Sequence, residues 1–479
     1  MKYLYLFIIS LSLLGCSSPV GQNIFNAQGE MAGEVTMHGA ILQSRLTASD
    51  TLVEGDLPGL KGLARFEISG TRDFEIPLRT KWLEALPEND FIVKANVNDL
   101  KPGSRYYYRL TYGRDTVRVK TGNINQFTTL GGATSDSPAS FVVVTGMNYS
   151  FFYHGPKNDG QGAYQGPDRP LGFPALESIH KINPDFITFT GDNVYYDHPK
   201  ELSASDIADM RKKWHEQFFQ PRVKELFSKI PAYWEKDDHD HRYNDSDTTS
   251  ARQPSHALGV KTFKEQVPVT SPGEQNAVTY RTHRINKHLQ IWLVEGRDYR
   301  SPNEMEDGPE KTLWGAKQKE WLKTTLLESD AAFKILISPT PMIGPDDAYK
   351  IDNHTNPDGF QHEGKEFLQW LSENGLPNEG FYIICGDRHW QYHSIHPAGV
   401  EEFSCGALVD ANSRAGRLPG DPKSSDPEAL LTVPYIQGKG EESGGFLEVK
   451  VESEKDTVMA SFNFYDENGK LLYSTVKKR

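Results

Sequence analysis

Residues 234–245 combine several side chains that could bind a metal ion. These twelve residues include five carboxylates, two imidazoles and one side-chain amide. Carboxylates this close together repel one another unless a cation neutralises them, and oxygen atoms are the ligands that hard cations such as Ca²⁺ prefer. The segment therefore predicts a metal site, although a solvated acidic loop can have the same composition.

Two apolar runs elsewhere in the chain end in Gly-Asp. Residues 185–190 lead into Gly191 and Asp192, and residues 381–385 lead into Gly386 and Asp387, with His389 two residues later. Ligands in α/β proteins gather in loops beyond the carboxyl ends of strands. One Gly-Asp turn is common, but two of them together with the acidic segment favour a single metal site built from three parts of the chain.

The segments that must position these side chains alternate in type after residue 140. Apolar runs typical of strands alternate with amphipathic stretches typical of helices. The expected strands are 141–144, 185–190, 289–294, 334–338 and 381–385, and the expected helices are 175–181, 207–219, 317–327 and 363–373. Three further strands are expected at 445–451, 457–465 and 470–474. This alternation predicts an α/β domain of layered β-sheets flanked by helices.

Residues 21–137 have a different texture. Short runs with strand character are separated by Gly, Pro, Asn and Asp, for example 33–37, 63–68, 91–97, 106–112 and 116–121. A Pro-Gly turn at 102–103 precedes Tyr106, as at the tyrosine corner of immunoglobulin-like sandwiches. A small all-β domain, fibronectin- or immunoglobulin-like, is therefore expected at 16–137, and the larger domain at 138–479.

The first residues resemble an export signal. An apolar run from residue 3 to residue 14 ends in Leu13-Leu14-Gly15-Cys16, which resembles a bacterial lipobox. We therefore expect a signal peptide at 1–15 and a lipid on Cys16. The exported protein would then be anchored to a bacterial membrane, either at the outer membrane or on the periplasmic or cell-surface side. A plain signal peptide is the alternative.

Bulk composition narrows the choice of function. A chain of 479 residues is long enough for two domains, and its formal net charge of −13 disfavours a nucleic-acid scaffold. The three cysteines do not form a disulfide framework. Cys385 and Cys405 could pair, but two buried free thiols are favoured.

The order of the motifs resembles the PhoD-type alkaline phosphatases of the calcineurin-like metallophosphoesterase superfamily. The matching segments are Gly191-Asp192-Asn193-Val194-Tyr195, residues 234–240, Glu295-Gly296-Arg297-Asp298-Tyr299-Arg300, and Gly386-Asp387-Arg388-His389. The resemblance runs from about residue 25 to the end. It implies a metal-dependent hydrolase of phosphomonoesters or phosphodiesters outside the cytoplasm, whose substrate is a phosphate-ester small molecule or a phosphorylated macromolecule.

The resemblance also implies two metal ions that share Asp192. A calcium site would use Asp192, Asp237, Asn244 and Asp387, and an iron site would use Asp192, Tyr195 and His389. His239, Arg297 and Arg300 are the candidates for stabilising the charge of the phosphate, because arginine pairs with phosphate through two N–H groups.

One position departs from the family. Met147 stands where the family has a metal-binding cysteine, and a neutral thioether is a poor ligand for ferric iron. The second ion could therefore be manganese or zinc. The departure also keeps open an alternative function, a non-catalytic calcium-binding surface protein with a degenerate site.

Overall fold

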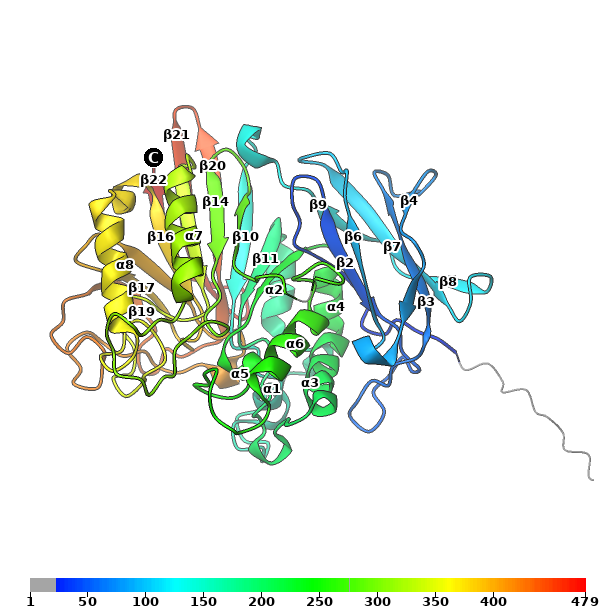
Figure 1. Cartoon of the computed structure of the whole chain (residues 1–479), viewed down its shortest axis with the longest axis horizontal. Coiled ribbons are helices and arrows are strands. Elements are labelled where there is room, and N and C mark those ends of the chain that lie inside the picture. The colour runs from blue at the N-terminus through cyan, green and yellow to red at the C-terminus, as the bar shows by residue number, and fades with distance from the viewer. Residues whose placement is uncertain (1–22, 275) are drawn as a thin grey trace, which may run out of the picture.

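The computed structural model describes residues 23–274 and 276–479, so the expected signal peptide at 1–15 and Cys16 lie outside the described residues. Two stacked sheets dominate the larger part of the chain (Figure 1). The first has the order β22-β21-β20-β10-β11-β12-β1-β2-β6 and the second β13-β14-β15-β16-β18-β17-β19. The metal-site turns predicted from the sequence follow β11 and β16.

The strands of the first sheet are, in sheet order, Leu471–Lys478, Thr457–Asp466, Gly445–Glu454, Ala139–Val144, Phe186–Thr190, Ala232–Glu235, Glu30–Gly33, Ala40–Arg45 and Ile92–Val97. Those of the second are Arg281–Arg284, Leu289–Leu293, Phe333–Ser338, Phe381–Cys385, Glu401–Cys405, Gln391–Ile395 and Thr432–Ile436. The helices are α1 Tyr149–His154, α2 Pro174–Ile182, α3 Ile207–Phe219, α4 Pro221–Phe227, α5 Asp238–His241, α6 His256–Gln266, α7 Gly315–Glu328 and α8 Gln361–Glu373.

The central strands are apolar on both faces because both faces are covered. In β10, Phe141 and Val143 point into the core between the two sheets, whereas Val142 and Val144 point into the core under α2, α3 and α4. Side chains of a strand alternate between its faces, so a strand buried on both sides has a continuous apolar run. Helices α7 and α8 cover the outer face of the second sheet (Figure 1). The predicted layered α/β architecture is confirmed.

The N-terminal part is the expected small β-sandwich. Its first sheet is β1-β2-β6, and its second contains β4 (Leu78–Arg79), β3 (Gly62–Ser69), β7 (Arg105–Gly113) and β8 (Val119–Thr121), with β5 (Leu83–Ala85) and β9 (Asn125–Thr128) pairing at its sides. The hydroxyl of Tyr106 accepts a hydrogen bond from the amide of Lys101 at 3.0 Å, which is the contact of a tyrosine corner.

Strand pairing and side-chain contacts join the sandwich to the larger part of the protein, in addition to the covalent chain. Strand β1 pairs in parallel with β12 through Gly33 and Ala232, so the first sheet runs through both parts. His215 of α3 contacts Asp56 at 2.6 Å and Asp90 at 2.7 Å, and both aspartates belong to the sandwich. The boundary expected at residue 137 falls between β9 and β10, and it stays a prediction.

Several elements differ from the sequence expectations. The strand expected at 33–37 is observed at Glu30–Gly33. Strand β12 was not expected; it has only four residues, and the last two belong to the acidic segment. Cys385 and Cys405 are both buried and free, as favoured from the sequence. Within the described residues, no helix is long and apolar enough to cross a membrane.

Candidate metal centre

The ends of three strands meet at one edge of the stacked sheets. Thr190 at the end of β11 pairs with Glu235 at the end of the parallel strand β12, so the segments that follow lie side by side. A Cβ on Gly191 would lie 2.4 Å from the backbone nitrogen of Asp237, and a Cβ on Gly386 would lie 2.5 Å from the Thr190 hydroxyl. The two glycines are therefore required for this close approach.

Both aspartates that follow these glycines have the left-handed backbone conformation. The φ angle is 54° at Asp192 and 57° at Asp387. Residues other than glycine rarely adopt this conformation, although aspartate tolerates it better than most, and such residues are enriched at active sites. Both side chains are buried, with relative exposures of 1% and 6%.

One carboxylate oxygen of Asp192 contacts both Tyr195 and His389, which were predicted as ligands. Its Oδ2 accepts the Tyr195 hydroxyl at 2.6 Å and lies 3.0 Å from Nε2 of His389. The side chain of Asn412 donates to the Tyr195 hydroxyl at 2.8 Å and so fixes its direction. Oδ1 of Asp192 is buried and has no hydrogen-bond partner among the described residues, which leaves it available to a cation.

Asp238 and His239 lie next to Asp192. One oxygen from each aspartate and one ring nitrogen of His239 lie within 4.8 Å of one another. Nδ1 of His239 contacts Asp197 at 2.6 Å, so Nε2 is the nitrogen left for the site. The sequence expectation had named Asp237 and passed over Asp238, although both stand in the same acidic segment.

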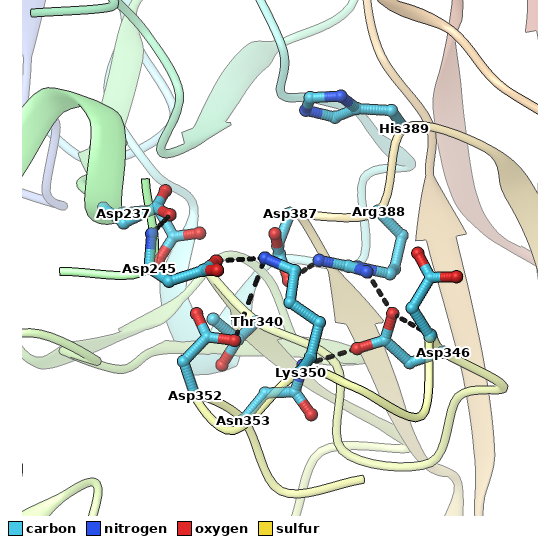
Figure 2. Close-up of polar contacts among 12 residues, drawn as sticks. Asp237, Asp245, Thr340, Asp346, Lys350, Asp352, Asn353, Asp387, Arg388 and His389 are labelled. Carbon is cyan, nitrogen blue, oxygen red and sulfur yellow. Dashed lines mark hydrogen bonds and ion pairs between the residues drawn. The ribbon is translucent and has the colours of Figure 1, made fainter. Parts of the chain in front are cut away.

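Asp237 is held by Arg297. Its Oδ1 accepts from Nε of Arg297 at 2.7 Å, while its Oδ2 is buried and accepts no hydrogen bond within the described chain. Figure 2 shows Asp237 and Asp387 below His389. Asn244 is exposed, and its backbone amide donates to Asp197 at 2.9 Å, so its assignment as a metal ligand stays a prediction.

Asp240, which the sequence expectation did not include, holds two of the turns together. Its carboxylate accepts from the backbone amides of Asp192 at 3.3 Å and Asp237 at 2.7 Å, and from the side chain of Asn193 at 2.5 Å. Three residues, from the turn after β11 and from the start of α5, thus converge on one carboxylate. Acidic residues in such segments therefore serve as scaffold as well as ligand.

Arg297 and Arg300 are interior residues. Arg297 is fully buried, pairs with Asp237 at 2.6 Å and with Asp352 at 3.2 Å, and donates to the carbonyl of Ser246 at 2.8 Å. Arg300 is 3% exposed and donates to the carbonyl of Gly296 at 2.8 Å. Arg297 is thus engaged with two carboxylates, whereas Nη2 of Arg300 is buried and has no hydrogen-bond partner among the described residues. The phosphate-stabilising role of both arginines stays a prediction.

The electrostatics of the centre favour a bound cation. Burial raises the pKa of Asp192 to about 7, and the charges of Asp238 and Asp387 add to the increase. Burial likewise raises the pKa of Asp240 to about 7, and the charge of Asp192 adds to it. Carboxyl groups with such pKa values take up protons near neutral pH unless a metal ion supplies the positive charge.

The pKa values of His389 and His239 are shifted in opposite directions. Burial lowers the pKa of His389 well below its ordinary value, helped by the charge of Arg414, so this imidazole is neutral and can be a metal ligand. Burial would also lower the pKa of His239, but the charges of Asp197, Asp238 and Asp192 outweigh burial and raise it well above its ordinary value. Asp197, which is not among the proposed metal ligands, thus favours the cationic form of His239, and this form suits contact with a phosphate.

The donors that converge here fit metal ions. Oδ1 of Asp192 and Oδ2 of Asp237 are buried acceptors without hydrogen bonds in the described part of the chain, and carboxylate oxygens suit hard cations. Tyr195 and His389 add a phenol oxygen and an imidazole nitrogen, which suit a transition metal. Met147 lies in the apolar core beside this centre, and its amide donates to the carbonyl of Asp192 at 2.9 Å.

Comparison with known proteins agrees with this architecture. Residues 141–458 match the PhoD-like phosphatase domain, and residues 17–130 match the PhoD-like phosphatase, N-terminal domain. Alkaline phosphatase D of Bacillus subtilis (strain 168) is 20% identical over 463 residues, which cover 85% of this chain and 73% of that protein.

Two solved structures share the fold. A structure of PhoD superposes with a TM-score of 0.71 at 16% identity, covering 95% of this chain and 89% of that one. The purple acid phosphatase PPD1 from yellow lupin (Lupinus luteus) seeds gives a TM-score of 0.60 at 10% identity, covering 93% and 73%. With its strand-end carboxylates and both domain matches, the chain belongs to the PhoD-like phosphatase family and is a phosphoester hydrolase.

Proposed function

We propose that the protein hydrolyses phosphate esters at a two-metal centre in which Asp192 is shared by both ions. The observation that carries the proposal is the position of Asp192. One of its oxygens contacts Tyr195 and His389, and the other is buried, without a hydrogen bond, in the described chain. A carboxylate arranged in this way can bind one ion with each oxygen.

The two groups of donors differ in chemistry. Tyr195 and His389 lie on one side of Asp192 and suit iron, manganese or zinc. Asp237, Asp238 and Asp387 offer oxygen atoms alone and suit calcium. When bound, the ions supply positive charge and Lewis acidity toward the phosphoryl group.

His239 is the residue of the chain that would contact the substrate. Asp197 fixes the imidazole through Nδ1, so Nε2 points toward the carboxylates that hold the ions. A cationic imidazole at this position donates a hydrogen bond to a phosphoryl oxygen and stabilises the charge that develops there. Its fixed orientation means that little entropy is lost when the substrate binds.

Removal of metal tests the two-metal proposal. Treatment with a chelator is expected to lower the hydrolysis of a phosphomonoester by at least about tenfold, because the carboxylates would then hold protons instead of cations. Adding back calcium together with iron, manganese or zinc should restore activity. Assays of monoesters and diesters with each ion alone, with elemental analysis, identify the ions. Full activity with calcium bound and no second metal would contradict the two-metal proposal.

We also propose that the protein is exported and anchored to a bacterial membrane through a lipid on Cys16. The lipobox-like sequence at residues 13–16 supports this. Cys16→Ala is expected to move the protein from the detergent phase to the aqueous phase in Triton X-114 partitioning, because one thioether-linked lipid would be lost. Wild type and variant in the same phase would show that the anchor is absent.

A further inference from the structure

A second group of carboxylates lies beside the metal centre and shares one residue with it. One oxygen from each of Asp238, Asp245 and Asp352 lies within 4.8 Å of the others. Asp238 and Asp352 are buried and Asp245 is partly buried. Negative charges at this spacing in a protein interior repel one another strongly, so the group requires positive charge nearby.

Hydrogen bonds neutralise this group only in part. Asp238 accepts from the amide of Asp245, and Oδ2 of Asp352 accepts from Arg297 at 3.2 Å. The same guanidinium pairs with Asp237 at 2.6 Å, so its charge is shared with the metal centre. Oδ1 of Asp352 is buried and accepts no hydrogen bond from the described residues.

Lys350 places a second positive charge in this group. Its Nζ forms an ion pair with Asp245 and lies 3.9 Å from Oδ1 of Asp352. Figure 2 shows the ammonium group between these two carboxylates. The lysine side chain is 6% exposed, whereas lysines in proteins are rarely buried without a charge to pair with.

The loop that carries Lys350 has its own contacts. Asp346 accepts from the side chain of Asn353 at 2.7 Å, and the amide of Lys350 donates to the carbonyl of Asp347 at 3.2 Å. These contacts do not involve the ammonium group. The loop therefore delivers Nζ to the carboxylates, and shortening the side chain should leave the backbone in place.

We infer that Lys350 is a tethered cation that takes the place of a divalent metal ion among Asp238, Asp245 and Asp352. An ammonium group has a positive charge, and this one pairs with Asp245 and lies within ion-pair distance of Asp352, where a bound Ca²⁺ would supply the same compensation of charge. Removal of the lysine head group turns these three carboxylates into a site for a hard divalent cation. The inference goes beyond the proposed phosphoesterase activity and does not depend on its substrate.

The test compares Ca²⁺ binding by wild type and Lys350→Ala after removal of metals with a chelator. Isothermal titration calorimetry is expected to show one additional Ca²⁺ per chain in the variant, bound at least about tenfold more tightly than any corresponding event in the wild type. Lys350→Met, which keeps most of the aliphatic stem, should gain the same ion. Thermal unfolding with and without Ca²⁺ gives a second readout, since the ion should stabilise the variants more than the wild type.

Two further variants make the result decisive. Lys365→Ala removes an exposed lysine of α8 and should bind as many ions as the wild type. Asp245→Asn combined with Lys350→Ala should lose the additional ion, because one of the three carboxylates is gone. Equal Ca²⁺ stoichiometry in wild type and both Lys350 variants would overturn the inference, as would an additional ion that persists in the double variant. A higher KM together with an unchanged number of bound Ca²⁺ ions would also overturn the inference, and it would indicate that Lys350 contacts the substrate.

Discussion

Replacing Asp192 with asparagine is expected to lower kcat/KM for a phosphomonoester by about a thousandfold or more, which corresponds to about 4 kcal/mol of transition-state stabilisation. The amide has no charge, and one of its two oxygen positions becomes an NH₂ group that cannot bind a cation. Because Oδ2 contacts both Tyr195 and His389, the loss affects the ion on that side as well. We expect the purified variant to be depleted in both metals.

Elemental analysis and a steady-state assay check this prediction. Asp185→Asn is a matched control, because Asp185 precedes the same strand at its opposite end and accepts a hydrogen bond from the amide of Ser140. The control should retain metal content and activity within about twofold, the level expected of a surface substitution. Full metal content in Asp192→Asn would refute the shared-ligand assignment.

His239→Asn is expected to lower kcat by about 10² to 10³-fold while leaving the metal content close to that of the wild type. Asparagine removes the cationic ring that Asp197 holds at 2.6 Å. The loss should fall mainly on kcat, because the charge of the phosphoryl oxygens grows in the transition state. The ring of Tyr195, 4.3 Å away between centroids, provides no substitute for this charge.

Asp197→Asn disturbs His239 without removing its ring. The variant keeps the imidazole ring of His239. It weakens the contact with residue 197, which orients the ring and raises the pKa of His239 in the wild type. We therefore expect a smaller loss of kcat than in His239→Asn. Steady-state kinetics and metal analysis of the three proteins provide the comparison. Loss of metal from His239→Asn, with activity restored by excess metal, would show that His239 is a ligand and not a contact of the substrate.

The sequence by itself determined the elements and the turns that carry the chemistry. Alternating apolar and amphipathic segments predicted the strands before Asp192 and Asp387 and the helix at Ile207–Phe219, because side-chain periodicity is a local property. Strand-Gly-Asp turns predicted that both carboxylates leave the sheets at one edge, because parallel strands end on the same side. The order of these motifs was enough to identify the family.

Only the tertiary structure decided which side chain of each motif faces the centre. Asp237 and Asp238 are adjacent and chemically equal, yet the turn after β12 directs Asp238 toward Asp192 and places Asp237 against Arg297. The direction of a side chain in a loop depends on backbone angles that have no fixed period, so residue order does not reveal it.

Long-range contacts decided the rest. Arg297 donates to Asp352, which stands 55 residues away, and no local pattern indicates that the two are paired. Asn412 reaches Tyr195 across 217 residues, and Lys350 reaches Asp245 across 105. The stacking of two sheets brings these side chains together, whereas the sequence determines only the residues within each strand and turn.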